Sequence, residues 1–274
     1  MKRSLLLLAM AALLGSPAGA QGISDVSISG DTLTATILLP GNLSADLSLE
    51  FEEVVGLSAA NLGLSVEVVN PTALLSRLPA GGLVTVPSAF PVVLRVEPPA
   101  NSPLSFSGVY KLNLHTHNLN FTAGCPLRLY TASQGGAFRD ITETMGMGSY
   151  RVRGGGGTFS EFAIVADARP VDSVIGAKFA AIDSLLSSQG HLIAPAVLSR
   201  LQQEIAAARA SHAAGQTTVA AQQVEVFATT VRDNSGAAIP DVWRPTGDLQ
   251  NLAGRLRAAA ASLRFSLNLK ASPV

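Results

Sequence analysis

The chain has 274 residues, with 19 lysines and arginines balanced by 19 aspartates and glutamates, and charged residues make up only 14% of it. Without a basic stripe the sequence lacks the electrostatic pattern of a nucleic-acid-binding protein, so we expect no nucleic-acid partner. Cys125 is the only cysteine, which excludes an intrachain disulfide, and we expect it to be buried as a small apolar residue.

The first twenty residues have the three parts of a secretory signal peptide. Lys2 and Arg3 supply positive charge, Ser4 to Leu14 form an apolar run too short to span a bilayer, and Ala18-Gly19-Ala20 fits a cleavage site. We therefore predict a signal peptide over residues 1–20 and export to the periplasm or the cell exterior. No membrane insertion is expected after cleavage.

Residues 21–169 alternate between apolar and polar side chains with the period of a β-strand. The clearest stretch is LSADLSLEFEE at residues 43–53, and others lie at residues 64–68, 92–97, 109–114 and 126–132. Clusters of Gly, Pro and Asn separate these stretches, with no helical pattern between them. We predict an N-terminal immunoglobulin-like antiparallel β-sandwich over residues 21–169.

Two histidines share one face of a predicted strand. In LNLHTHNLNF, residues 112–121, His115 and His117 are two positions apart and could share a metal ion, but zinc normally takes three or four protein ligands. Lys111 and Asn113 lie on the same face, which favours a solvated surface. A metal site would need a carboxylate from elsewhere in the fold, and we predict no cofactor.

Three carboxylates lie near the predicted loop-rich end of the sandwich: Asp140, Glu143 and Glu161. Paired carboxylates can cleave a glycosidic bond or bind calcium, but these three belong to no motif for either role. Motifs for serine or cysteine nucleophiles are absent from the sequence. We expect solvated loop charges and a non-catalytic protein. The alternative is a secreted carboxylate-dependent hydrolase, or a carbohydrate-binding protein, that uses this end of the sandwich.

Four consecutive glycines, Gly154 to Gly157, follow Arg151 and Arg153. A phosphate-binding loop would need a strand before it and a helix after it, whereas strand-like sequence lies on both sides here. We predict a hairpin turn whose glycines adopt positive φ, and no phosphate site.

Residues 126–167 resemble the closing strands of extracellular β-sandwich modules in bacterial surface proteins. The resemblance lies in the Leu-x-Leu-Tyr stretch at residues 127–130 and the Phe-Ser-x-Phe-Ala stretch at residues 159–163. It implies no chemistry.

After Pro170 the apolar spacing becomes helical. We predict one helix from Val171 to Gly190, a second from Pro195 to Gly215, a third from Thr217 or Thr218 to Gly236, and a fourth carrying Leu249, Leu252, Leu256 and Leu263. Short connections predict a small antiparallel helical bundle over residues 170–267, with a tail at residues 268–274.

Residues 185–239 resemble the FIMAH-type helical module of bacterial secreted and surface proteins. The shared features are a helix ending at Gly190, an apolar residue soon after it, a leucine-spaced helix leading to Ala208, the Phe227…Val231 pair and the Gly236…Ile239 turn. The resemblance implies an accessory module on an exported protein and supplies no catalytic residues.

Two features of the helical half are candidate contact sites. Trp243, the only tryptophan, precedes the last helix; we expect it to plug one end of the bundle, with stacking on a sugar or partner as the alternative. The weakly charged polar faces that carry Gln202, Gln203, Gln222 and Gln223 are unsuited to membrane insertion. They suit a protein contact or packing against the sandwich. We predict an accessory interaction or spacer module whose partner is a protein or a cell-envelope component.

Overall fold

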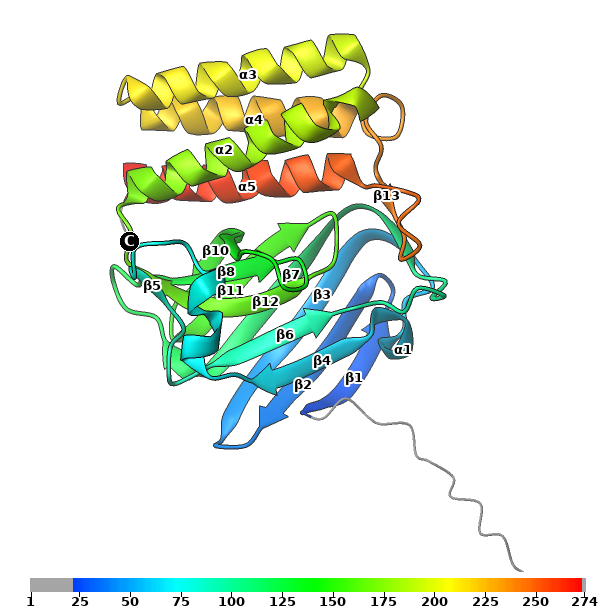
Figure 1. Cartoon of the computed structure of the whole chain (residues 1–274), viewed down its shortest axis with the longest axis vertical. Coiled ribbons are helices and arrows are strands. Elements are labelled where there is room, and N and C mark those ends of the chain that lie inside the picture. The colour runs from blue at the N-terminus through cyan, green and yellow to red at the C-terminus, as the bar shows by residue number, and fades with distance from the viewer. Residues whose placement is uncertain (1–21, 273–274) are drawn as a thin grey trace, which may run out of the picture.

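The computed structural model describes residues 22–272, and the predicted signal peptide lies outside this range. Two antiparallel sheets occupy residues 23–167 and four long helices occupy residues 171–271, so a β region is followed by an α region (Figure 1). No helix within residues 22–272 combines the length and apolar character needed to cross a membrane.

The two sheets are called sheet A and sheet B. In spatial order, sheet A contains β1 (Ile23–Ser29), β2 (Thr32–Leu39), β3 (Leu43–Val55), β7 (Ser105–Asn120), β11 (Ser149–Gly156) and β10 (Thr142–Gly146), and β13 (Val242–Trp243) also pairs with β7. Sheet B contains β4 (Leu64–Val68), β6 (Val92–Val96), β12 (Glu161–Asp167), β8 (Leu127–Ala132) and β9 (Arg139–Asp140), and β5 (Val84–Thr85) pairs with β12. A short helix α1 (Ala59–Leu62) and a 3-10 helix η1 (Pro71–Arg77) connect strands.

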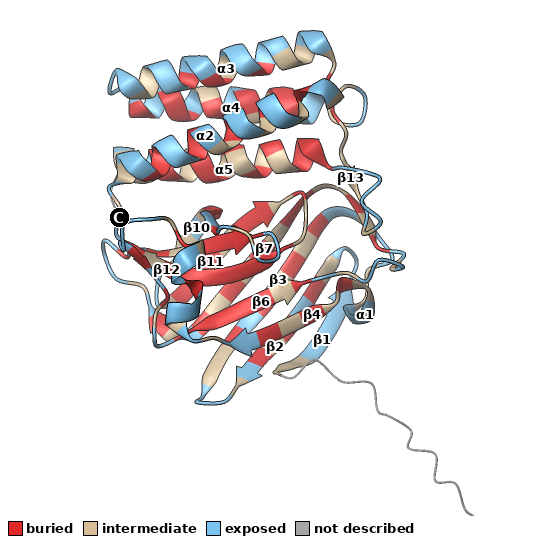
Figure 2. Cartoon of the chain, in the orientation of Figure 1, coloured by how far each residue is buried: buried red, intermediate tan, exposed pale blue. Residues whose placement is uncertain are grey.

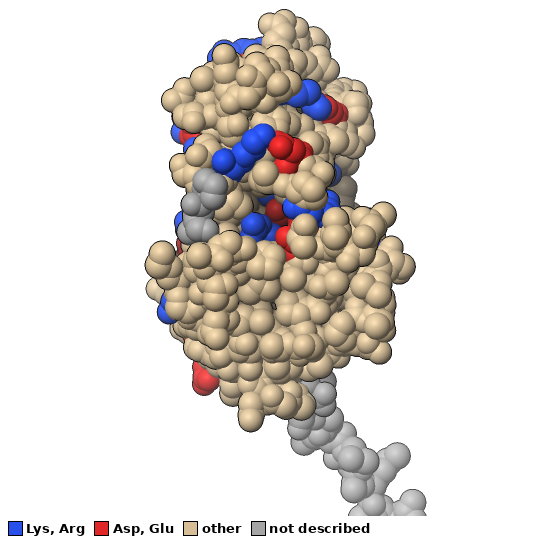
Figure 3. Space-filling view, turned by 90° about the vertical axis from the view of Figure 1, so that its left-hand side faces the viewer, with Lys and Arg blue, Asp and Glu red and all other residues tan. Residues whose placement is uncertain are grey.

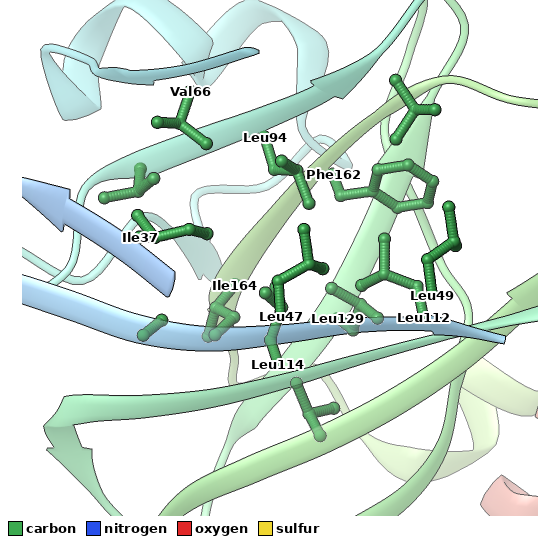
Figure 4. Close-up of a cluster of buried hydrophobic side chains, with 14 of the residues drawn as sticks. Ile37, Leu47, Leu49, Val66, Leu94, Leu112, Leu114, Leu129, Phe162 and Ile164 are labelled. Atoms are coloured by element: carbon green, nitrogen blue, oxygen red, sulfur yellow. The ribbon is translucent and has the colours of Figure 1, made fainter. Parts of the chain in front are cut away.

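Sheets A and B face each other across a shared apolar core. The predicted alternation along β3 is confirmed, since Ala45, Leu47 and Leu49 are buried while Asp46 is exposed. Figure 4 shows this core, in which Leu47, Leu49, Leu112 and Leu114 of sheet A meet Leu94, Leu129, Phe162 and Ile164 of sheet B. Burial of one face of β2, β3 and β7 fixes the register of these strands in sheet A. Cys125 is free and buried at the edge of this core, as expected.

The predicted immunoglobulin-like fold is wrong. In an immunoglobulin fold, the strands lettered A to G along the chain form one sheet in the order A-B-E-D and a second sheet from C, F and G. Sheet A of this protein instead begins with three consecutive strands, β1, β2 and β3. It also receives the strand β13 from the helical half. The sheets also join at one corner, where the amide of Ile141 donates to the carbonyl of Leu129 at 2.9 Å. Three short elements depart from the predicted division at Pro170: α1 and η1 are helical turns within the β region, and β13 is a strand within the helical region.

The long helices are α2 (Val171–Gln189), α3 (Pro195–Ala213), α4 (Thr217–Asp233) and α5 (Leu252–Ala271), with a 3-10 turn η2 (Gly190–Leu192) after α2. The first three match the predicted bounds closely. The fourth begins at Leu252 because the side chain of Asn251 accepts from the amide of Gly254 at 2.7 Å and caps the helix. It continues to Ala271, past the predicted end of the helical region at residue 267.

The helices stack on the sheets in layers. In Figure 1, α5 lies nearest the sheets and α3 lies farthest from them; α5 contacts β7, β10 and β11. The four helices share their own apolar core, seen in Figure 2 as buried residues on the faces that meet. Small residues let α5 approach the sheet, because a Cβ on Gly254 would lie 2.2 Å from the carbonyl oxygen of Gly108.

A buried ion pair joins the helical layer to the sheets. Nζ of Lys178 on α2 lies 2.7 Å from Oδ2 of Asp140 on β9, and the two side chains are only 7% and 3% exposed. The same ammonium donates to the carbonyl of Ser262 at 3.1 Å and to Oγ of Ser266 at 2.8 Å, both on α5. Burial lowers the pKa of Lys178, and the Asp140 carboxylate partly opposes this effect.

We expect Lys178→Met to lower the free energy of unfolding by about 3–5 kcal/mol, because it leaves the Asp140 carboxylate buried without its cation. Lys270→Met is the matched control, because Lys270 also links α5 to α2 through an ion pair with Asp172. The Asp172 carboxylate is 61% exposed, so the free energy of unfolding should fall by only about 0–1 kcal/mol. Urea denaturation measures both. The double variant Lys178→Met/Asp140→Asn should recover part of the loss. Equal losses in the two single variants would contradict this account.

Candidate functional site

A cleft of about 240 Å³ lies between the sheets and the helical layer. Its sheet side is formed by Arg139 and by Gly155 to Gly157, and its helix side by Lys178, Ser184 and Arg255. A second hollow of about 240 Å³ shares Arg139, Asp140 and Lys178 with it, so the two form a continuous seam. Figure 3 shows one face of the molecule, where Lys, Arg, Asp and Glu side chains gather along the seam while most of the surrounding surface is uncharged.

The glycine run forms part of the cleft wall, and the predicted hairpin turn is wrong. Gly154 to Gly156 belong to β11 and pair with β7, whereas the next strand, β12, lies in the other sheet. None of the four glycines has positive φ. They are required by close approach: a Cβ on Gly156 would lie 2.3 Å from Oη of Tyr110, and one on Gly157 would lie 2.5 Å from the backbone nitrogen of Arg255.

Two arginines in the cleft have no anionic partner within residues 22–272. The guanidinium of Arg139 has neither a salt bridge nor a hydrogen bond in this part of the chain, and the residue is exposed at the mouth of the cleft. Arg255 donates from Nη1 to Oε1 of Gln189 at 2.8 Å, which is a neutral acceptor. Desolvation by the surrounding protein lowers the pKa of both guanidinium groups, and the charge of Arg139 lowers the pKa of Arg255 further.

The cleft therefore carries excess positive charge. Of its charged residues, Lys178 is neutralised by Asp140, while Arg139 and Arg255 are not neutralised. Guanidinium groups present several N–H donors in a planar fork that matches a carboxylate or a phosphate. The chemistry that this arrangement supports is the binding of a small anion.

The three candidate carboxylates do not converge on one pocket. Asp140 pairs with Lys178 in the seam. Glu143 pairs with Lys111 at 2.6 Å, and both lie in sheet A. Glu161 of sheet B pairs with Arg95 of the same sheet and with Arg77 of η1. All three lie on strands, and Asp140 and Glu161 are buried. The expectation of solvated loop charges is wrong for all three, because each lies on a strand, has a side chain that is at most 9% exposed and is paired with a cation inside the folded chain.

His115 and His117 lie on the outer face of sheet A, as expected from the sequence. The carboxylate that a metal site would need is present: Oδ2 of Asp46 lies 3.1 Å from Nδ1 of His115 and 3.2 Å from Nε2 of His117. Asp46 is 69 residues from His115 in the sequence and reaches it because β3 pairs with β7.

Trp243 belongs to the sheet core and does not plug the helical bundle. It pairs with Phe106 through β13, and its ring lies 5.4 Å from the ring of Phe106 and 4.9 Å from that of Phe159. Gln202, Gln203 and Gln222 are exposed on the outer helices, and Gln223 is partly buried. These helices lie away from the sheets, so their polar faces do not pack against the sandwich (Figure 1).

The sequence pattern does not single out Arg139, Lys178 or Arg255 as residues of a site. One signal was present for Lys178, since it occupies an apolar position of the helical pattern between Ile175 and Phe179. A lysine at such a position needs a buried partner. Arg139 and Arg255 have no comparable signal, because only the stacking of α5 on the sheets brings them together.

One protein-family model matches residues 7–271, and its description is "Family of unknown function (DUF6689)". No curated protein and no solved structure matches the chain.

The Glu161 ion pairs predict a stability that depends on pH. Burial by itself would raise the pKa of Glu161, but hydrogen bonds and charges from Arg77 and Arg95 outweigh it and hold the pKa below the usual 4.5. A depressed pKa stabilises the fold above pH 4.5, and this stabilisation is lost as pH falls through the folded pKa. We expect Glu161→Gln to flatten the acid limb of a plot of unfolding free energy against pH.

Glu67→Gln is the control for this measurement, because Glu67 also pairs with Arg95 but its side chain is 48% exposed. Its effect on the acid limb should be smaller, since solvent screens the pair. An acid limb unchanged in Glu161→Gln would contradict the prediction.

Proposed function

The chain belongs to the DUF6689 family of unknown function, and we propose that it is a non-catalytic binding protein that holds a small anion in the cleft between its sheets and its helical layer. The observation that carries the proposal is the placement of Arg139 and Arg255 in one cleft without a carboxylate partner among the described residues. The ligand class is a carboxylate or a phosphate.

The energetic cost of this arrangement supports a binding role. Arg255 is partly buried and Arg139 is exposed at the mouth, and two like charges in one cleft repel each other unless a counter-charge is present. A bound anion would supply that counter-charge, and its attraction would offset the desolvation of Arg255. Stability sacrificed at one position in this way is typical of binding sites.

The size of the cleft limits the ligand. At about 240 Å³ it lies below the range of roughly 300–1,000 Å³ that is usual for sites of drug-sized molecules. Phosphate, sulfate or a short carboxylate has a suitable size. The end of a larger molecule could enter through the mouth beside Arg139, so an anionic group on a protein or a cell-envelope component belongs to the same ligand class.

We further propose that binding takes place outside the cytoplasm. The support is the signal-peptide pattern of residues 1–20, in which Lys2 and Arg3 precede the apolar run and Ala18-Gly19-Ala20 follows it. An accessory module with no reaction of its own fits such a location, in agreement with the separate ion pairs of Asp140, Glu143 and Glu161.

The variant Arg139→Gln separates binding from folding. Without added anion, its free energy of unfolding should equal or exceed that of the wild type, because the repulsion of Arg255 is relieved. Inorganic phosphate should stabilise the wild type, by about 2.7 kcal/mol at a hundred times its dissociation constant, and should stabilise the variant much less. Calorimetric titration and thermal unfolding at matched ionic strength measure the two effects.

Arg232→Gln is the matched control, since Arg232 lies exposed on α4 beside Asp233 and should leave phosphate binding unchanged. Equal stabilisation of the wild type and Arg139→Gln by phosphate, sulfate and acetate would show a general salt effect and overturn the proposal.

A further inference from the structure

We propose that Asp46, His115 and His117 form a binding site for a divalent transition-metal ion on the outer face of sheet A. The site is separate from the cleft and does not depend on its function. It combines two imidazoles from one strand with a carboxylate from the neighbouring strand, within a solvent-open hollow of about 560 Å³ that Asp46 and His115 line.

The pairing of β3 with β7 brings the three side chains together. Asp46 is directly opposite His115 in the antiparallel register, and His117 is two residues further on, on the same face of β7. The two imidazole rings lie 4.5 Å apart between centroids. Because this register is fixed by the buried face of both strands, the outer side chains are held on a rigid support.

The distances fit the coordination shell of a small ion. Metal–ligand bonds of about 2.0–2.2 Å place neighbouring donor atoms about 2.8–3.1 Å apart around an octahedral ion and about 3.3–3.6 Å apart around a tetrahedral one. Oδ2 of Asp46 lies 3.1 Å from Nδ1 of His115 and 3.2 Å from Nε2 of His117. All three donor atoms lie within 4.8 Å of one another, so an ion could bind with small side-chain rotations.

The second nitrogen of His115 has a partner that suits a metal ligand. Nε2 lies 2.5 Å from Oγ of Ser149 on β11. When Nδ1 binds a metal, Nε2 carries the proton and donates to this hydroxyl, which fixes the ring and its tautomer. A serine hydroxyl both donates and accepts, so the same contact also serves the metal-free ring.

The donor set defines the class of metal. Imidazole nitrogens favour Cu²⁺, Ni²⁺ and Zn²⁺ over Mg²⁺ and Ca²⁺, which prefer oxygen ligands. Asp25 adds a negative charge to the lining of the same hollow, and Arg151 and Arg153 add positive charge. Arg151 is opposite His115 on β11, but it donates from Nη1 to the carbonyl of Met147. Three protein ligands leave positions for water, so we expect an exchangeable site that binds Cu²⁺ more tightly than Zn²⁺.

The test is calorimetric titration of the tag-free chain with Cu²⁺ and with Zn²⁺. We expect one equivalent of each metal to bind. His117→Ala and Asp46→Asn should each weaken binding at least about tenfold, because even a partner that only orients a metal ligand contributes about that much. Electron paramagnetic resonance of the Cu²⁺ form should show coupling to nitrogen, reduced in His115→Ala. Circular dichroism and thermal unfolding confirm that each variant folds.

His191→Ala is the control, because His191 is exposed on the helical layer and lies outside the three-residue cluster. It should bind both metals like the wild type. Binding that is lost equally in His191→Ala, or that is unchanged in the folded variants of Asp46, His115 and His117, would overturn the proposal. So would a wild-type chain that binds neither metal.

Discussion

The buried Lys178–Asp140 ion pair constrains the arrangement of the whole molecule. A lysine in the apolar stripe of α2 needs a carboxylate, and the only one that reaches it among the described residues comes from β9, in the sheet region. The pair therefore fixes α2 over the corner where the two sheets join. Hydrogen bonds from the same ammonium to Ser262 and Ser266 fix α5 beside it. The β and α regions are thus held by polar contacts of defined geometry, as well as by apolar packing.

This polar seam also explains why a cleft exists there. A fully apolar interface would close by packing side chains together, whereas the cleft between the sheets and the helical layer is lined by three cations and one buried carboxylate. The charges of Lys178 and Asp140 neutralise each other, and Arg139 and Arg255 line the space that remains. The proposed anion site and the attachment of the helices are consequently parts of one electrostatic arrangement. Loss of the Lys178–Asp140 pair lowers the stability of the fold, while loss of the Arg139 charge weakens binding of the anion.

The proposed metal site has a different physical origin. It lies on the solvent-facing side of sheet A, and its geometry follows from the strand register that the core imposes. The three ligands contribute little to packing, so their replacement tests binding without a large effect on folding. The cleft is formed where sheets meet helices, and the metal site where two strands pair. The proposed anion site and the proposed metal site are therefore independent of each other.

The sequence by itself determined the local structure. Period-two burial along β3 and the bounds of α2, α3 and α4 follow from apolar spacing and from Pro and Gly positions, which act over a few residues. Strand order, the role of the glycine run and the partners of Trp243, Asp140 and His115 were decided only by the tertiary structure. The spacing of apolar residues predicts which face of a strand is buried, but it does not predict which strand lies beside it. Asp46 and His115, or Arg139 and Arg255, become neighbours only through pairing and packing between distant segments, because these contacts depend on the burial of the whole core.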